Sequence, residues 1–419
     1  MNSTASVSAS ASNPTTSTWG FELPAHTPAA ARAVLKLLSR LQVGTLDVQL
    51  PSGTQARFGS GEGPQASIRL LSWEVCQSAL QKGDVGFAES YFDGHWTTPD
   101  LSALLRLLIA NRTALEDVIY GTWWGSILGR VRHWMHRNTR SGSRKNIHAH
   151  YDLGNSFYRL WLDETMNYSS AWFNGQYDQP MAQAQMAKVR RSLKQCQVKS
   201  GDRVLEIGCG WGAVAEEATA RLGAQLVGVT LSTEQLAFAQ ERMLRHASET
   251  RADLRLQDYR DVRDGPFDAV VSIEMFEAVG REFWPGYFQA VHQQLKPGGR
   301  ACIQTITIAD GLFERYVKST DFIQQYIFPG GMLPSPTVFR EQARLAGLVV
   351  EGEMAFGRDY AETLRRWREA FLAQETQVRA LGFDQRFLRI WEFYLAYCEA
   401  AFDTGNTDVV QFTLRRPIA

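Results

Sequence analysis

From about residue 203 onward, short apolar strand patterns alternate with amphipathic helical patterns, and this alternation most constrains the fold. Strands are expected at 203–207, 226–230 and 267–272, each followed by a helix, with a further strand at 301–306. Repeated strand–helix units place their strands side by side in one sheet and cover both of its faces with helices. The sequence therefore predicts a doubly wound α/β sheet, with a last strand at 409–414 after a long helical insertion.

A glycine-rich turn joins the first of these strands to its helix. Gly208, Gly210 and Gly212 follow the strand directly, where glycine lets the backbone adopt a positive φ and approach a ligand. The dinucleotide fingerprint needs a different glycine spacing and an acid for the ribose about 20 residues on, but the second strand ends in Thr230-Leu-Ser. The pattern therefore resembles S-adenosylmethionine (SAM) binding better than NAD binding.

Charge and cysteine content exclude several classes of function. The 419 residues include 44 basic and 44 acidic ones, so the chain has no overall basic field for capturing nucleic acid. No apolar run reaches the roughly 18 residues that span a bilayer. The five cysteines are scattered and contain no C-x-x-C pair, which is typical of a reducing cytoplasm rather than a disulfide scaffold or a zinc site. We expect a cytoplasmic protein without bound metal or nucleic acid.

Changes in composition predict four segments. Residues 1–25 are rich in Ser, Thr and Ala and are expected to form a disordered tail. Residues 26–119 contain a helical pattern, a hairpin, another strand and further helices, which predicts a small α+β domain. Residues 120–147 form a basic amphipathic linker, and residues 148–419 form the α/β domain that contains the glycine-rich turn.

The linker is unusual in its charge. Residues 121–147 contain no Asp or Glu, yet six cationic residues lie between Arg130 and Lys145, and Trp124 and Trp134 fall on one helical face. A basic helix with tryptophans suits an anionic membrane surface. The alternative is an inter-domain helix whose tryptophans pack into the core.

Blocks of sequence from about residue 147 to 414 resemble, in order, the catalytic domain of cyclopropane-fatty-acyl-phospholipid synthases. They include His150-Tyr-Asp-Leu-Gly-Asn-Ser-Phe-Tyr, Met275-Phe-Glu-Ala-Val-Gly, Tyr326-Ile-Phe-Pro-Gly-Gly and Tyr394-Leu-Ala-Tyr-Cys. The resemblance implies a Rossmann-like class I SAM-dependent methyltransferase domain with a helical lipid-binding insertion. It also implies methylene transfer from SAM to the cis double bond of an unsaturated phospholipid acyl chain, by an enzyme peripherally associated with the inner face of the membrane. The small N-terminal domain looks like the extra domain of the phospholipid-acting members.

The resemblance also implies two sets of site residues. The expected SAM contacts are Tyr168, Ser169, Gly208, Gly210, Thr230, Leu231, Gln235, Tyr259 and Arg260. The expected catalytic residues surround a bound bicarbonate that serves as the base, with Cys398 at the family's active-site cysteine; they are Ser170, Glu277, Gln304, Ile306, Tyr360 and Cys398.

Three positions depart from the familiar family pattern. Ser170 and Gln304 stand where many members have cysteine and histidine, and Ala278 replaces a histidine beside Glu277. Serine and glutamine can still hydrogen-bond a small oxyanion, but one proton acceptor is lost. Methyl transfer to the same double bond without ring closure, giving a branched or methyl-alkene chain, therefore remains open. So does a catalytically inactive lipid- or SAM-binding protein.

Several site residues also have a structural alternative. Glu277 is placed to cap a helix, Tyr259 and Tyr360 to pack as buried aromatic rings, and Cys398 to lie inert in an apolar helix. Whether the chain is a monomer or a homodimer is not predicted.

Overall fold

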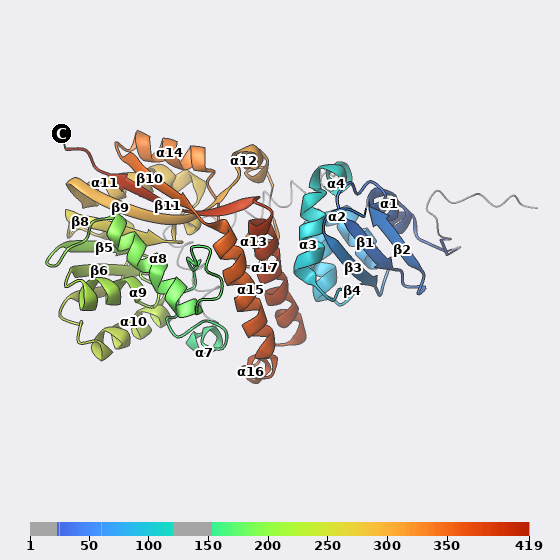
Figure 1. Ribbon diagram of the computed structural model, residues 1–419, viewed down its shortest axis with the longest axis horizontal. Helices are drawn as coiled ribbons and strands as arrows, with labels where there is room; N and C mark the ends of the chain where they lie inside the picture. The colour runs from blue at the N-terminus through green and yellow to red at the C-terminus, as the bar shows by residue number, and fades with distance from the viewer. Residues whose placement is uncertain (1–22, 25, 60, 120–152, 320, 419) are drawn as a thin grey trace, which may run out of the picture.

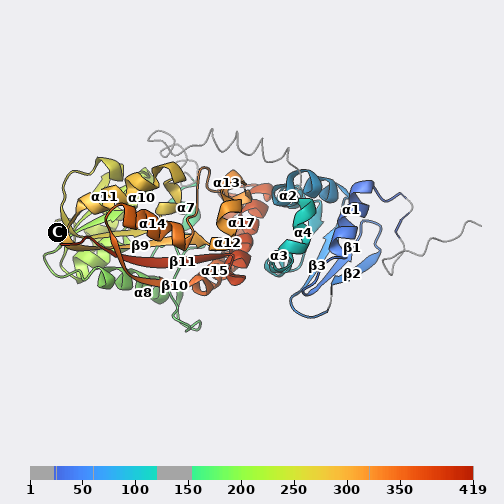
Figure 2. The same ribbon diagram turned by 90° about the horizontal axis from the view of Figure 1, so that it is seen from above.

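The computed structural model describes residues 23–24, 26–59, 61–119, 153–319 and 321–418. Two sheets lie at opposite ends of an elongated molecule, with helices packed between them (Figures 1 and 2). Most of the predicted N-terminal tail and the whole basic linker 120–147 lie outside the described residues, and the predicted domain boundaries stay predictions.

The N-terminal sheet has four strands in the order β2-β1-β3-β4. The predicted hairpin is confirmed, since β1 and β2 pair antiparallel, whereas β3 runs parallel to β1. Apolar side chains such as Val48, Phe58 and Ile68 are buried under the helices of this part. Its elements are α1 (Ala29–Leu38), β1 (Thr45–Gln49), β2 (Gln55–Gly59), β3 (Gln65–Leu70), α2 (Glu74–Phe92), β4 (Trp96–Thr97), α3 (Leu101–Ala110) and α4 (Arg112–Ile119).

The second sheet has seven strands in the order β10-β11-β9-β8-β5-β6-β7. The neighbours from β9 to β7 pair parallel, and β11 pairs antiparallel with both β9 and β10. The predicted doubly wound α/β fold is therefore confirmed, including the last strand. The strands are β5 (Arg203–Ile207), β6 (Gln225–Thr230), β7 (Ala252–Leu256), β8 (Phe267–Ile273), β9 (Leu295–Ile308), β10 (Val349–Ala355) and β11 (Thr407–Arg415).

Helices cover both faces of this sheet. One apolar cluster joins the sheet to α8, α9 and α10, and another joins it to α11 and α14. The helices are α7 (Asn155–Tyr158), α8 (Met181–Gln195), α9 (Ala213–Glu216), α10 (Thr233–Arg245), α11 (Trp284–Gln294), α12 (Asp310–Tyr316), α13 (Phe322–Tyr326), α14 (Pro336–Leu345), α15 (Gly357–Ala373), α16 (Glu375–Ala380) and α17 (Gln385–Asp403).

Three elements differ from the sequence predictions. The helix expected after the first strand, 203–207, is α-helical only as α9 and continues as a π-helix over Glu217–Arg221. Strands β7 and β10 were not predicted. Each lies at an edge of the sheet, and β10 alternates between exposed and half-buried residues around Gly352, so neither carries the continuous apolar run of a central strand.

The order of the strands reverses at β5, because β6 lies on one side of it and β8 on the other. In open α/β sheets, ligands bind in the crevice outside the carboxyl ends of the strands at such a switch point. The turns after β5 and β8 are therefore the expected place for a functional site.

Candidate active site

The glycine-rich turn after β5 brings the backbone up to a cavity. Gly208, Gly210 and Gly212 have φ angles of 85°, 49° and 85°. A β-carbon at Gly208 would lie 2.9 Å from the side chain of Met275, and one at Gly212 would lie 3.1 Å from Cβ of Ala239. A β-carbon at Gly210 would meet no protein atom within 4 Å, and this residue lines the cavity. An added side chain at Gly210 would thus reach into the cavity without meeting a protein atom, although the φ of 49° is strained for residues other than glycine.

This smaller cavity, of about 170 Å³, lies at the carboxyl ends of β5, β6 and β8. All nine residues that the resemblance assigns to SAM line it: Tyr168, Ser169, Gly208, Gly210, Thr230, Leu231, Gln235, Tyr259 and Arg260.

Local contacts hold several of these side chains in place. The Thr230 hydroxyl donates a 3.0 Å hydrogen bond to the amide oxygen of Gln235. The guanidinium of Arg260 donates to both carboxylate oxygens of Asp258, at 2.8 and 2.6 Å. The ring of Tyr259 packs edge-on against that of Tyr287, and burial raises the pKa of its hydroxyl to about 12. The aromatic and polar groups of the cavity are therefore ordered before any ligand binds.

Glu206 supplies a buried carboxyl group to the same cavity. It is the fourth residue of β5, lines the cavity and is 4% exposed. Its Oε2 atom is buried without a hydrogen-bond partner, and burial raises the pKa of this carboxyl well above its usual range. A buried carboxyl group without a partner suits a cationic ligand. SAM carries a sulfonium and an ammonium, so the residues present fit SAM.

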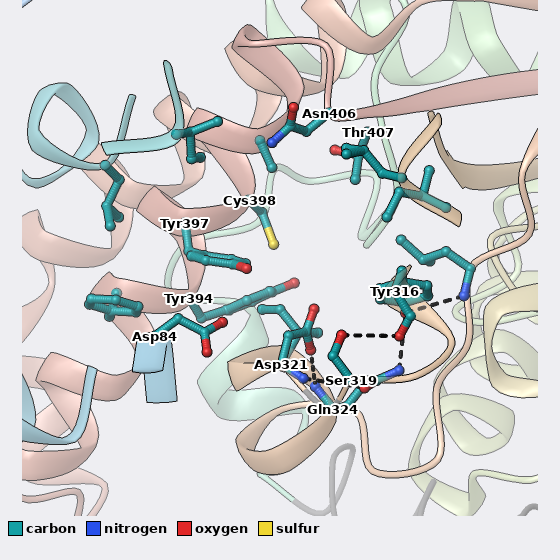
Figure 3. Close-up of a pocket in the computed structure, with 18 of the residues that line it drawn as sticks. Asp84, Tyr316, Ser319, Asp321, Gln324, Tyr394, Tyr397, Cys398, Asn406 and Thr407 are labelled. Atoms are coloured by element: carbon teal, nitrogen blue, oxygen red, sulfur yellow. Dashed lines mark hydrogen bonds between the residues drawn. The ribbon is translucent and has the colours of Figure 1, made fainter. Parts of the chain in front are cut away.

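A larger cavity, of about 410 Å³, lies between the two parts of the molecule. Its apolar lining comes from the N-terminal helices, for example Leu37, Leu80 and Leu105. It also comes from α15 and α17, for example Leu364 and Phe402. Figure 3 shows the sulfur of Cys398 directed into this space beside the rings of Tyr394 and Tyr397 from the same helix. The cavity has the apolar, partly aromatic character of a lipid site.

Cys398 lies in α17 and is partly buried. Burial raises the pKa of its thiol far above the usual value. The thiol is therefore protonated at neutral pH, and only a thiolate is an effective nucleophile. Cys398 lines the cavity as a neutral side chain rather than as an activated nucleophile.

The larger cavity also has a polar region, labelled in Figure 3. Asp84 and Asp321 both line it. Burial, and then the charge of Asp321, raises the pKa of Asp84 to about 7, and burial raises the pKa of Asp321. The charge of Arg112 acts in the opposite direction on both. The cavity thus combines a long apolar wall with one polar region.

The two cavities meet at three residues. Tyr168, Glu274 and Ala278 line both of them. Glu274 is the first residue after β8 and has a φ of 49°, a left-handed conformation that is uncommon for residues other than glycine. Its backbone N–H donates to the carbonyl of Gln304 at 2.8 Å, which fixes the turn that carries this side chain to the junction.

The carboxylate of Glu274 accepts three hydrogen bonds. Its Oε1 accepts from the backbone N–H of Ser170 at 2.8 Å and from the side-chain amide of Gln304 at 2.7 Å. Its Oε2 accepts from the hydroxyl of Tyr360 at 2.6 Å. The amide oxygen of Gln304 is in turn held by Gln411 at 2.9 Å. Glu274 is not among the site residues predicted from the sequence.

These donors belong to the residues that the resemblance assigns to bicarbonate. Ser170, Gln304 and Tyr360 already direct hydrogen bonds at the carboxylate of Glu274. The hydroxyl of Ser170 donates instead to the carbonyl of Ala171. A free bicarbonate would have to compete with a covalently attached carboxylate for the same donors, so the residues present do not fit it.

Glu277 lies one turn further on. Its Oε1 accepts a 3.0 Å hydrogen bond from the hydroxyl of Thr305 and another from the backbone N–H of Ile306, while Oε2 is buried without a partner. Burial, and then the nearby Glu274, raises the pKa of Glu277 to about 8. This carboxyl is therefore mostly protonated at neutral pH and holds the end of β9, which carries Ile306, against the larger cavity.

The predicted catalytic residues fall into two groups, those that line the larger cavity and those that contact Glu274 instead. Glu277, Ile306, Tyr360 and Cys398 line the larger cavity, whereas Ser170 and Gln304 contact it only through Glu274. A signal for Glu274 was present in the sequence, because it is an acidic residue at the carboxyl end of a predicted strand. No group of metal-binding side chains and no helix apolar and long enough to cross a membrane occurs among the described residues.

Comparison with known families gives one clear match. Residues 138–412 match the family model described as mycolic acid cyclopropane synthetase. Tuberculostearic acid methyltransferase UfaA1 of Mycobacterium tuberculosis is 41% identical over 398 residues, which are 93% of this chain and 92% of that protein. Cyclopropane-fatty-acyl-phospholipid synthase of Escherichia coli is 34% identical over 361 residues, 86% of this chain and 90% of that protein.

Solved structures agree in fold. The crystal structure of mycolic acid cyclopropane synthase CmaA1 with SAH and CTAB is 33% identical in sequence and has a TM-score of 0.61. The match covers 65% of this chain and 98% of that one. Coclaurine N-methyltransferase is 16% identical, with a TM-score of 0.62 over 79% of this chain and 99% of that one, and this second likeness concerns the fold alone.

Proposed function

Because this chain belongs to the mycolic acid cyclopropane synthetase family of SAM-dependent methyltransferases that modify unsaturated fatty acyl chains, we propose a more specific activity for it. The enzyme transfers the methyl group of SAM to a cis double bond in the acyl chain of a membrane phospholipid. The cation that results loses a proton without ring closure and gives a methyl-alkene or methylene-branched chain.

One observation carries this choice of product. The similarity to a protein named as a tuberculostearic acid methyltransferase extends over 93% of the chain at 41% identity. The ring-forming synthase of Escherichia coli is 34% identical over 86%. The comparisons therefore favour methyl transfer without ring closure over the cyclopropane product expected as the main outcome from the sequence.

The geometry of the two cavities supports this chemistry. SAM, when bound, supplies an electrophilic methyl group. Gly210 and Glu206 border the smaller cavity, where they are placed to receive and orient a cationic ligand. Tyr168 and Glu274 stand at the junction, so they face the point where the methyl group meets the alkene. Methyl transfer across such a junction needs no movement of either ligand between cavities.

The walls of the larger cavity suit the cation that forms on the acyl chain. Water would add to a carbocation, and an apolar cavity keeps water away from it. The ring of Tyr360 stacks on that of Phe402 with centroids 4.4 Å apart, and Tyr394 lines the same space. Aromatic faces attract a cation through their quadrupole, by about 0.5–2 kcal/mol per ring.

Ring closure is the second candidate. The family model and the relative from Escherichia coli are both named for cyclopropane formation. The two outcomes differ only in which bond is formed when a proton leaves, because both add one carbon and two hydrogens to the acyl chain.

The test incubates the purified enzyme with SAM and vesicles of dioleoyl phosphatidylglycerol, followed by mass spectrometry and proton NMR of the released fatty acids. We expect a gain of one carbon and two hydrogens with olefinic or vinylidene protons. Cyclopropane protons would overturn the product assignment in favour of ring closure. SAM binding without any modified acyl chain would favour the inactive lipid-binding alternative.

The basic linker gives the enzyme a route to its substrate. Cationic residues near an anionic leaflet contribute about 1 kcal/mol each, and this attraction weakens as salt rises. We expect the enzyme to associate peripherally with the inner face of the membrane through residues 120–147. Co-sedimentation with anionic vesicles should fall when Arg130, Arg132 and Arg137 are changed to Gln. Equal binding of this variant at every salt concentration would leave the segment as an inter-domain helix.

A further inference from the structure

A carboxylate of the chain itself lies where the family resemblance places a free bicarbonate. Glu274 receives hydrogen bonds of 2.6–2.8 Å from Tyr360, Gln304 and Ser170. All three donors were assigned to bicarbonate from the resemblance. A carboxylate and a bicarbonate present the same pair of oxygen atoms to hydrogen-bond donors, so the side chain can take over the role of the ion.

Glu274 is also in the right place to act on the substrate. It lines both the smaller and the larger cavity, and it is only partly buried because it faces them. Among the six catalytic residues predicted from the resemblance, none lines both cavities. A base must lie within hydrogen-bond reach of the proton that it removes, and the junction is where the methylated carbon forms.

The surroundings of Glu274 prepare it for this task. Burial raises the pKa of its carboxyl, while the charge of the fully buried Lys188 and the three hydrogen bonds lower it. The Lys188 ammonium donates to the hydroxyl of Ser169 at 2.5 Å, next to Ser170 in the chain. The carboxylate is thus held in one orientation near a positive charge, and burial makes it more basic than an exposed glutamate.

We propose that Glu274 is the catalytic base of this enzyme and replaces bicarbonate. The proposal rests on the proposed function, because it assigns the proton acceptor of that reaction. It makes the enzyme independent of dissolved carbon dioxide.

The step balances without an oxidant or a reductant. The alkene electron pair forms the new C–C bond, and the C–S bond of the methyl donor breaks with its electron pair going to sulfur. The positive charge then lies on the acyl chain. A carboxylate oxygen of Glu274 takes one proton, and the electrons of that C–H bond form the new double bond. Glu274 leaves the step as a neutral carboxyl group and later returns its proton to solvent.

The experiment compares three forms of the full-length enzyme in buffer freed of carbon dioxide, with and without added sodium bicarbonate. They are the wild type, Glu274→Gln and Glu274→Gly. Glycine suits the φ of 49° at this position, so the Gly variant is expected to fold. Glu392→Gln is the matched control, since this carboxylate accepts a 2.7 Å hydrogen bond from Tyr91 and lines neither cavity. Calorimetry measures SAM binding for each form.

We expect the wild type to modify acyl chains at the same rate in both buffers. Glu274→Gln should retain SAM binding and lose at least about 10²-fold in turnover, the scale of a lost general base. Glu274→Gly should be equally slow without bicarbonate and recover at least about tenfold when it is added, because the ion can then reach Ser170, Gln304 and Tyr360. Glu392→Gln should behave as the wild type does.

Two results would overturn the proposal while leaving the proposed function intact. One is an active wild type that loses its activity when bicarbonate is removed. The other is an active wild type that Glu274→Gln matches in turnover. A wild type that modifies no unsaturated phospholipid under any condition would instead overturn the proposed function, and this inference with it.

Discussion

The hydroxyl groups of Tyr168 and Tyr394 lie 2.8 Å apart and share a hydrogen bond. Tyr168 lines both cavities, whereas Tyr394 comes from α17 and lines only the larger one. The contact therefore fixes an aromatic ring at the junction from the side of the larger cavity.

This contact predicts a defect in turnover and not in SAM binding. Tyr394→Phe keeps the ring but removes the hydroxyl that holds Tyr168, and such a hydrogen bond contributes about 1 kcal/mol. We expect kcat to fall about fivefold, with an unchanged Kd for SAM in calorimetry. Tyr177→Phe is the control, because it removes a comparable 3.1 Å bond to Asp359 outside both cavities. A normal kcat for Tyr394→Phe would show that the pair does not orient the ring.

The position of Gly210 predicts a defect in SAM binding itself. Its β-carbon would enter the smaller cavity and meet no protein atom, so Gly210→Ala should weaken SAM binding at least about tenfold, which corresponds to about 1.4 kcal/mol. Gly53→Ala is matched to it, since Gly53 also has a positive φ and open space around its β-carbon, but lies in an exposed turn. Similar loss of SAM affinity in both variants would mean that backbone strain is the cause and the cavity is not.

Glu277 predicts a pH dependence of stability. Its pKa is about 8 in the folded protein, above the ordinary value of 4.5. Between these values the unfolded chain releases this proton and the folded chain keeps it, so the free energy of unfolding falls as pH rises from about 4.5 to about 8. Glu277→Gln cannot ionise and should lose less stability across that window.

Urea denaturation at about pH 5 and about pH 8 measures this difference. Glu341→Gln is the control, because Arg344 lowers the pKa of that exposed carboxyl, in the direction opposite to the change at Glu277. An equal fall in stability for Glu277→Gln and the wild type would contradict a raised pKa at Glu277.

Glu399 predicts how strongly the N-terminal part is held to the catalytic part. This buried carboxylate accepts hydrogen bonds from Ser102 at 2.8 Å and from Arg368 at 3.1 Å, and pairs with Arg106 at 3.2 Å. Removing one partner of a buried ion pair leaves the other charges without a partner, which lowers the free energy of unfolding by about 3 kcal/mol. We expect Glu399→Gln to lower the midpoint of thermal unfolding clearly.

The exposed pair of Arg57 and Asp47 provides the comparison. An exposed ion pair contributes little to stability because water screens it, so Asp47→Asn should change thermal unfolding little. Equal effects of the two variants would show that the Glu399 cluster does not hold the two parts together.

The sequence predicted best those features that form from residues close together in the chain. The glycine-rich turn after β5 follows from a strand–turn–helix unit with a known ligand side. The nine SAM contacts came from the family resemblance, and these residues line the same cavity as the turn. The edge strands β7 and β10 were missed, because charged residues interrupt both of them and neither has a continuous apolar run.

Glu274 was not predicted for a different reason, because its contacts depend on residues far apart in the sequence. Its neighbours at the site come from distant parts of the chain, with Ser170 104 residues before it and Tyr360 86 residues after it. A pattern search along the chain registers Glu277, which carries the family resemblance, but gives no sign that three separate donors converge on the residue at the end of β8. Only the packing of β8, β9 and α15 shows this.

The larger cavity takes its wall from both ends of the molecule, from α1, α2 and α3 on one side and from β9, α15 and α17 on the other. An acyl chain bound there touches both groups of helices at once, so its binding energy adds to the cohesion between them. While it is bound, the acyl chain would pack against apolar side chains of both groups of helices, as a residue of the hydrophobic core does. Substrate binding should therefore make the two ends of the protein unfold more cooperatively, and release of the modified chain should make them more independent.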